Sequence, residues 1–313
     1  MGSQQKELAA FKEGLLDVIF HLPPESVKEE VVDNITAFRD TPVKYMLERS
    51  PEMSTQYYDL ISHRGAFTNK KVRQAFSYAI DRNKITEQIL NGEGNPGIYG
   101  ITPPLFKDYN DTSLKGYNLD VIKAKKLLAE AGYPDGKGFP KVTLELNSGG
   151  SRHVITALEI QKELKKNLNV DIDFNIVSFP QKLEDAKYAK ADMFRSSWVA
   201  DYPNPESFLS VFYGKTVPTS INEPSFPNIA RYRNAAFDKL YESGMQANSK
   251  DEAYKLFLEA EKIAIEDAPV IVLWYDDNYR MLQARVRNFP VCPVQQYRNF
   301  SAVYFDEPVR APE

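Results

Sequence analysis

The sequence predicts an α/β fold, because helices and strands alternate along most of the chain. Between residues 141 and 177, a strand with alternating apolar residues, a helix and a second alternating strand follow one another. This order is typical of a βαβ unit. Amphipathic helices with apolar stripes occur on both sides of the unit, at residues 69–90 and 236–266. With 313 residues, the chain is large enough for two lobes.

The first 62 residues are predicted to combine two helices with short extended segments. Gly14 closes the first helix, and Pro24 suits the first turn of the second helix. In order, the predicted elements are helix 3–13, strand 15–20, helix 24–38 and two separate extended segments at 43–48 and 55–61.

From Asn69 onward, the predicted helices have clearer stripes, caps and stops. Apolar residues recur at helical spacing from Val72 to Ala79, and Asn118 is expected to cap a helix that Gly132 ends. The other predicted helices are 82–90, 151–167, 181–190, 236–246 and 251–266, and the predicted strands are 141–147, 170–177, a segment ending near Trp198, 270–275 and 279–284.

The composition argues against several kinds of partner and binding site. A net charge of −4 and the lack of a basic stripe give no case for nucleic acid as a partner. The single cysteine, Cys292, excludes an internal disulfide and a Cys-x-x-Cys site. The longest apolar runs are short, so the sequence predicts no membrane-spanning helix, and no signal peptide is visible. No metal or cofactor is expected, because the three histidines are scattered.

The segment from Arg195 to Asp201 brings a cation, an indole and an acid to the end of a strand. The proline-rich turn after Asp201 forces the backbone out of regular structure before a new helix starts near Glu206. Small ligands bind at the carboxyl ends of strands in open α/β sheets. This segment is therefore the first candidate for a binding site.

Four stretches of the chain resemble the oligopeptide- and dipeptide-binding proteins of ABC transporters. They occur in the order found in that solute-binding family, and the first is the most diagnostic. The stretches are residues 67–85 (FTNKKVRQAFSYAIDRNKI), 124–133 (AKKLLAEAGY), 198–205 (WVADYPNP) and 236–240 (AFDKL).

The resemblance implies the two-lobed fold of periplasmic binding proteins (type II, cluster C), which closes around its ligand. Residues 63–267 would form the distal α/β lobe, residues 1–62 a segment of the proximal lobe, and residues 268–313 the return to that lobe. The N-terminal half of family members has no counterpart here, so the chain is expected to be a C-terminal portion. It would comprise the distal lobe and part of the proximal lobe.

The resemblance also implies a set of ligand-binding residues. Asp201 matches the acid that pairs with the peptide α-amino group, whereas Arg195 and Lys187 fall where cations meet peptide carboxylates. Trp198 would line a side-chain pocket, Tyr275 would face the cleft near the hinge, and Tyr202 completes the Trp-x-Ala-Asp-Tyr motif. Ser197 and Val199 differ from the oligopeptide pattern, which leaves the side-chain preference of the pocket open.

Each of these residues also has a purely structural interpretation. Asp201 could cap the turn into the next helix, and Trp198 could be a core residue. Lys187 could be a solvated helix residue, and Arg195 part of a surface ion pair. Tyr275 could be buried with a satisfied hydroxyl.

The function implied by the resemblance is capture of peptides and their delivery to the membrane subunits of an ABC permease, without catalysis. Such a protein would work in the periplasm or at the cell surface, with or without a lipid anchor. The alternatives are the same fold binding an oligosaccharide, nickel or haem, a hydrolase with paired carboxylates, and an interaction module without a ligand. Self-association is expected, because a lobe that lacks half its sheet exposes edge strands and apolar surface.

Overall fold

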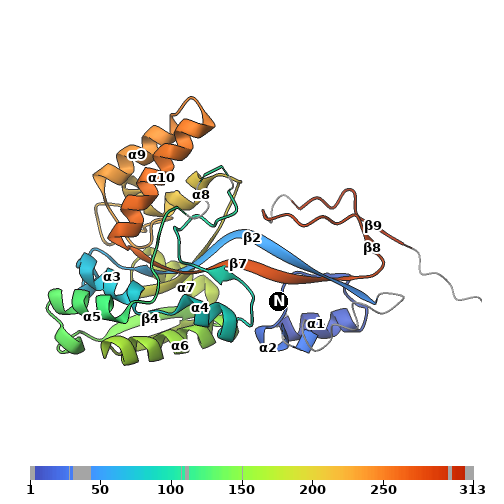
Figure 1. The fold of residues 1–313 in the computed structure, drawn as a ribbon, viewed down its shortest axis with the longest axis horizontal. Helices are drawn as coiled ribbons and strands as arrows, with labels where there is room; N and C mark the ends of the chain where they lie inside the picture. The colour runs from blue at the N-terminus through green and yellow to red at the C-terminus, as the bar shows by residue number, and fades with distance from the viewer. Residues whose placement is uncertain are drawn as a thin grey trace, which may run out of the picture.

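The protein is built around one mixed β-sheet with helices on both faces (Figure 1). The computed structural model describes residues 4–27, 29–30, 44–106, 108–109, 113–149, 151–294 and 298–306. The strand order is β1-β7-β2-β6-β4-β5, and β3 pairs separately with β7. The strands of this sheet are β1 (Val18–Ile19), β2 (Tyr45–Leu60), β3 (Asn95–Pro96), β4 (Val142–Asn147), β5 (Ile172–Val177), β6 (Met193–Val199) and β7 (Val270–Gln283).

The predicted βαβ unit is confirmed. Helix α6 (Ser151–Leu168) connects β4 to β5, and these two strands pair in parallel from Val142 opposite Ile172 to Asn147 opposite Val177. On its other side, β4 also pairs in parallel with β6, but only at Met193 and Phe194 of that strand. The short contact leaves the second half of β6 without β4 beside it.

Two long antiparallel strands, β2 and β7, run through the centre of the molecule (Figure 1). The prediction of separate segments at 43–48 and 55–61 was wrong, because β2 continues through Pro51. The strand tolerates this proline because the pairing register shifts between Pro51 and Thr55, and prolines within sheets occur at such irregularities. The separation predicted for 270–275 and 279–284 was also wrong, since β7 is continuous across Asp276, Asp277 and Asn278, which are residue types that strands disfavour.

Adjacent residues of the central strands point into two different cores. Tyr58 and Trp274 belong to the core packed against α3, α5 and α6, whereas Tyr57 and Tyr275 belong to the core under α8, α9 and α10. Strand residues alternate between faces, so one strand serves both cores. The helices of this part of the chain are α3 (Lys70–Tyr78), α4 (Arg82–Lys84) with a π-helical turn (Ile85–Ile89), α5 (Val121–Glu130), α7 (Phe179–Lys187), α8 (Pro205–Leu209), α9 (Ala235–Met245) and α10 (Lys250–Asp267).

The far ends of β2 and β7 carry a smaller group of elements (Figure 1). Here Phe11 of α1 (Gln4–Lys12) packs with Tyr45 and Met281. Strand 15–20 is shorter than predicted, with only β1 in the sheet. Helix 24–38 is described only as α2 (Pro24–Val27), and most of its predicted length lies outside the described residues. A separate two-stranded antiparallel sheet pairs β8 (Val286–Arg287) with β9 (Tyr304–Phe305).

The cap of α5 differs from the prediction. Asp120, and not Asn118, is the N-cap, because its carboxylate accepts a hydrogen bond from the Lys123 N–H at 2.9 Å. Both residue types are good caps, so the sequence pattern alone could not choose between positions two residues apart.

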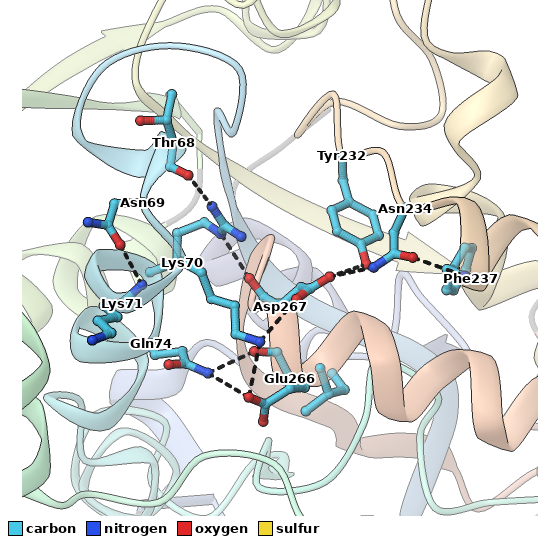
Figure 2. Close-up of polar contacts among 12 residues, drawn as sticks. Thr68, Asn69, Lys70, Lys71, Gln74, Tyr232, Asn234, Phe237, Glu266 and Asp267 are labelled. Atoms are coloured by element: carbon cyan, nitrogen blue, oxygen red, sulfur yellow. Dashed lines mark hydrogen bonds and ion pairs between the residues drawn. The ribbon is translucent and has the colours of Figure 1, made fainter. Parts of the chain in front are cut away.

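A polar network connects the ends of α3, α9 and α10 (Figure 2). The Asp267 carboxylate accepts hydrogen bonds from the Tyr232 hydroxyl at 2.7 Å and the Asn234 amide at 2.8 Å. Lys70 lies 3.2 Å from the same carboxylate. Arg73 donates from Nε to the Asp267 carbonyl at 2.9 Å. The network therefore fixes the point where the chain leaves α10 to enter β7.

The network predicts a pH-dependent contribution to stability. Burial alone would raise the pKa of Asp267, but the hydrogen bonds from Tyr232, Asn234 and Lys70 outweigh it and hold the pKa below its ordinary value. The contribution is present above the ordinary Asp pKa of about 3.9 and is lost as the pH falls through the lower folded value. We expect Asp267→Asn to reduce the free energy of unfolding by about 2 kcal/mol at pH 7. The difference in free energy of unfolding between Asp267→Asn and wild type, measured by urea denaturation, should be smaller near pH 3 than at pH 7. An equal difference at the two pH values would contradict this account.

Candidate ligand-binding site

A cavity lies beside the second half of β6, where β4 no longer covers the strand. Within the part of the chain that the structure describes, Arg195 to Val199 pair only with β2. Strand β6, helix α7 and the loop around Phe226 enclose a volume of about 420 Å³. We call this space the β6 cavity. Its lining includes Phe179, Lys182, Lys187, Arg195, Trp198 and Phe226.

Arg195 is a buried cation of β6 whose guanidinium turns toward Gln56 of β2, on the sheet face that also carries Tyr58 and Trp274. Its side chain is 9% exposed, and Nη2 donates to Gln56 Oε1 at 2.6 Å. Burial lowers the pKa of Arg195 to about 10, so the guanidinium stays charged at neutral pH. The alternative interpretation as a surface ion pair is wrong, because the residue is buried and its hydrogen-bond partner is a neutral amide.

A buried polar network continues from Arg195 across the central strands. The Gln56 amide donates to Asp276 at 2.7 Å, and Asp276 also accepts from Ser54 at 2.6 Å and from the Trp274 indole at 2.9 Å. Arg152 approaches the same carboxylate at 3.7 Å. The network therefore links strands β6, β2 and β7 beneath the cavity.

Two members of this region were missed by the sequence analysis. Arg152 and His153 lie in the first turn of α6, where Arg152 is buried and His153 is half-buried. The buried atoms Arg152 Nε, Arg152 Nη2 and His153 Nδ1 have no hydrogen-bond partner among the described residues. Burial, with Arg195 and Arg152 nearby, lowers the pKa of His153, so the imidazole is neutral. The sequence did contain one signal for these two residues, because they follow a Gly-containing turn at the carboxyl end of β4. Ligands bind at the carboxyl ends of strands in open α/β sheets.

The two lysines of α7 that line the cavity differ in burial. Lys187, a predicted site residue, is half-buried and lies 3.5 Å from the exposed Glu184. Lys182 was not predicted. It is 4% exposed, and its ammonium donates to the Arg195 carbonyl at 3.0 Å. Burial, with Arg195 nearby, lowers the pKa of Lys182 to about 8. A lysine in an amphipathic helix usually faces solvent, so the pattern gave no signal for this one.

Trp198 is both a core residue and a wall of the cavity. Its indole N–H donates to Ser207 Oγ at 3.2 Å, and its ring packs against the core of α8, α9 and α10. The ring centroid lies 6.2 Å from that of Phe226 across the cavity lining. The interpretation of Trp198 as a core residue and its interpretation as a pocket-lining residue are therefore compatible.

Asp201 lies on the exposed turn that follows β6. Asn204 is the N-cap of α8, because its side chain accepts from the Glu206 N–H at 3.0 Å. The interpretation of Asp201 as the helix cap is therefore wrong. Only its backbone N–H is engaged, with Ser207 Oγ at 3.3 Å, and within the described ranges its carboxylate makes no hydrogen bond or ion pair. The carboxylate is therefore available to a ligand.

The two predicted tyrosines lie apart from the cavity lining. Tyr202 is 41% exposed next to Asp201, and its hydroxyl donates to Glu206. Tyr275 is 2% exposed; its hydroxyl donates to the Gly100 carbonyl at 2.8 Å and accepts from the Tyr99 N–H at 3.2 Å. The structure thus brings Arg195, Trp198 and Lys187 together, places Asp201 and Tyr202 on the adjoining turn, and buries Tyr275 with its hydroxyl satisfied.

The described part of the chain shows neither a metal site nor a membrane helix. No three His, Cys, Asp or Glu residues within it form a group suited to a metal ion. Of the helices described, none is both long enough and apolar enough to cross a bilayer.

Comparison with known proteins identifies relatives among the bacterial solute-binding proteins. Residues 1–220 match the family model described as bacterial extracellular solute-binding proteins, family 5 Middle. The periplasmic murein peptide-binding protein MppA of Escherichia coli is 29% identical over 248 residues, which are 77% of this chain and 43% of MppA. The periplasmic oligopeptide-binding protein OppA of Salmonella typhimurium is 25% identical over 297 residues, or 92% of this chain and 50% of OppA. The chain thus spans about half the length of these curated relatives.

Solved structures share the fold. An oligopeptide-binding protein of Borrelia burgdorferi (OppAIV) superposes with a TM-score of 0.80 at 25% identity, covering 98% of this chain and 57% of that one. DppA of Helicobacter pylori, solved in complex with the peptide STSA, superposes with a TM-score of 0.82 at 23% identity, covering 98% and 56% respectively. These neighbours have the two-lobed fold of periplasmic peptide-binding proteins. The family match over most of the chain and the shared fold agree, and the chain belongs to family 5 of the bacterial extracellular solute-binding proteins.

Proposed function

We propose that the protein captures peptides and delivers them to the membrane permease of an ABC importer. The observation that carries the proposal is the arrangement along and after β6: a buried cation at Arg195, an aromatic wall at Trp198 and an uncommitted carboxylate at Asp201. A peptide carries an ammonium at one end and a carboxylate at the other, so charges of both signs are needed to hold it. The proposed chemistry is recognition without bond breaking.

Each site residue has a proposed role. Asp201 pairs with the peptide α-amino group, with Tyr202 beside it, and Trp198 forms a side-chain pocket. Arg195 and Lys187 supply positive charge for peptide carboxylates. Tyr275 is proposed to act from the strand that crosses between the lobes, by keeping β7 in place near the cleft.

We further propose a division into lobes. Residues 63–267 form the distal lobe, and residues 1–62 and 268–313 belong to the proximal lobe, so that β2 and β7 connect the two. The separate cores at the two ends of these strands support this division. Closure of the lobes would bury the turn that carries Asp201.

The proposed setting is the periplasm or the cell surface, and the proposed partners are the permease subunits. A further proposed contact is self-association through the two-stranded sheet of β8 and β9 and the segment before β9. Phe300, Tyr304 and Phe305 are all more than half exposed there, and exposed apolar groups of this kind favour association.

Native mass spectrometry of the gently purified 313-residue chain tests the proposed function. A binding protein of this type should carry ligands through purification, so we expect additional masses whose fragmentation yields amino-acid sequences.

A further inference from the structure

We propose that Ser207 is a positioning residue that fixes Asp201 and Trp198 relative to each other. This inference rests on the peptide-binding function proposed above and adds a residue that acts through its neighbours. The Ser207 hydroxyl oxygen accepts hydrogen bonds from the Trp198 indole N–H at 3.2 Å and from the Asp201 backbone N–H at 3.3 Å. A serine hydroxyl has two acceptor lone pairs, so one atom can serve both donors. The proposed pocket wall and the proposed ammonium anchor are therefore joined through a single oxygen.

Ser207 is buried at a firmly packed point of the molecule. It is 3% exposed, and the next two residues of α8, Phe208 and Leu209, are fully buried in the core shared with α9 and α10. Protein cores are close-packed, so a polar atom held beside them has little freedom to move. The two hydrogen bonds of Ser207 therefore attach Asp201 and Trp198 to this core.

The backbone of Asp201 lies just beyond the part of β6 that β2 holds. Strand β6 ends at Val199, and one further backbone hydrogen bond follows, from the Ala200 N–H to the Met53 carbonyl at 2.8 Å. The Asp201 N–H is the next donor along the chain, and its acceptor is Ser207. The Ser207 hydroxyl thus takes over from β2 in holding this end of the strand.

The position of the Asp201 carboxylate depends on this backbone contact. Within the described ranges, the carboxylate itself makes no hydrogen bond or ion pair, so its place is set by the backbone that carries it. An anchor that is held in place before the ligand arrives binds more tightly than one that must be ordered on binding. Loss of the Ser207 hydroxyl should therefore weaken recognition of the peptide ammonium.

Ser210, the C-cap of α8, provides a matched control. Its hydroxyl donates to the Ser207 carbonyl at 2.8 Å, a contact at the end of α8 that does not reach the strand end. Ser207→Ala and Ser210→Ala each remove one hydroxyl and one set of hydrogen bonds from the same short stretch. Only the first of them releases Asp201 and Trp198.

The two indole N–H groups of the chain provide a spectroscopic readout. The chain contains two tryptophans, and the Trp274 indole donates to Asp276 at 2.9 Å, away from Ser207. In Ser207→Ala, the Trp198 indole loses its acceptor, so we expect its N–H resonance in NMR spectra to shift and its hydrogen exchange to become faster. The Trp274 resonance should stay in place. Movement of both resonances would indicate a general change in packing and would contradict the proposed role.

Calorimetric titration of the 313-residue chain measures the effect on binding. The ligands are alanine-based pentapeptides with a free amino terminus and the same peptides with an acetylated amino terminus, so the ratio of the two affinities reports recognition of the ammonium. We expect Ser207→Ala to reduce this ratio about fivefold, because a hydrogen bond contributes about that factor. Ser210→Ala should leave the ratio within about twofold of the parent value.

A second variant keeps the test decisive. Ser207→Cys retains the shape of the side chain but offers only a weak acceptor, so it should also reduce the ratio, and it replaces Ser207→Ala if that variant does not fold. An unchanged ratio in a folded Ser207 variant would overturn the inference and leave peptide capture intact, as would an equal reduction in Ser210→Ala. A ratio near one in the parent would refute the role of Asp201 and the inference with it. Failure of the parent to bind either peptide would refute the proposed function itself.

Discussion

Replacing Asp201 with asparagine should weaken peptide binding about a hundredfold and leave the free energy of unfolding unchanged. The substitution removes a charge with almost no change in shape. An ammonium ion held by Asp201 in the closed site would lose the negative charge of that carboxylate, at a cost on the order of 3 kcal/mol. Stability should not change, because the Asp201 side chain is exposed and does not cap α8. Calorimetry and urea denaturation measure the two quantities.

The neighbouring cap provides a control with the opposite pattern. Asn204→Ala removes the side chain that accepts from the Glu206 N–H, so it should lower stability by about 1 kcal/mol and leave peptide affinity within about twofold. Parent-like affinity of Asp201→Asn would show that the anchor is elsewhere.

Replacing Arg82 with methionine should destabilise the protein by about 3 kcal/mol or more. Arg82 is 2% exposed and donates to the carbonyls of Val272, Ser77 and Ile80 at 2.6, 2.9 and 3.2 Å. Methionine fills similar volume but leaves these buried acceptors unsatisfied, and each costs about 1 kcal/mol or more. Burial lowers the pKa of Arg82 to about 10, so the charge is present at neutral pH.

A surface arginine serves as the matched control. Arg49 donates to the Gly92 carbonyl at 2.9 Å, but its side chain is 46% exposed, so Arg49→Met should cost less than about 1 kcal/mol. Equal losses in the two variants would mean that the buried contacts of Arg82 to β7 do not account for its effect.

These contacts give a physical meaning to the most diagnostic stretch of the sequence. Arg73 and Arg82 both lie within residues 67–85, and both donate to backbone carbonyls near the start of β7, at Asp267 and Val272. The stretch therefore holds the strand that crosses between the proposed lobes. Local periodicity showed its helices but could not show this role, because the partners lie about 190 residues away.

Elements with strong local signals could be predicted from the sequence, and elements defined by distant pairing could not. The βαβ unit from β4 to β5 follows from alternation and helical spacing. The continuity of β2 and β7 does not, since Pro51 and the Asp276–Asn278 run look like interruptions in the sequence, whereas the pairing of the two strands continues on both sides of the register shift at these residues.

The same limit applies to the candidate site. The motif from Trp198 to Tyr202 pointed to the strand end beside the β6 cavity, because a charge and an aromatic ring at a turn form a local pattern. Lys182 and Gln56 could not be found in that way. Their importance comes from burial against Arg195, a contact between α7, β2 and β6 that depends on the tertiary fold.

The most direct test of peptide capture is the mass of the protein as purified from cells under native conditions. The account predicts a series of complexes whose added masses fragment into peptides, and these masses should disappear after partial unfolding and refolding. Asp201→Asn, purified in parallel, should carry much less of this material. Purified protein that carries a single non-peptide compound, or that carries nothing and takes up no peptide on addition, would contradict the proposed function.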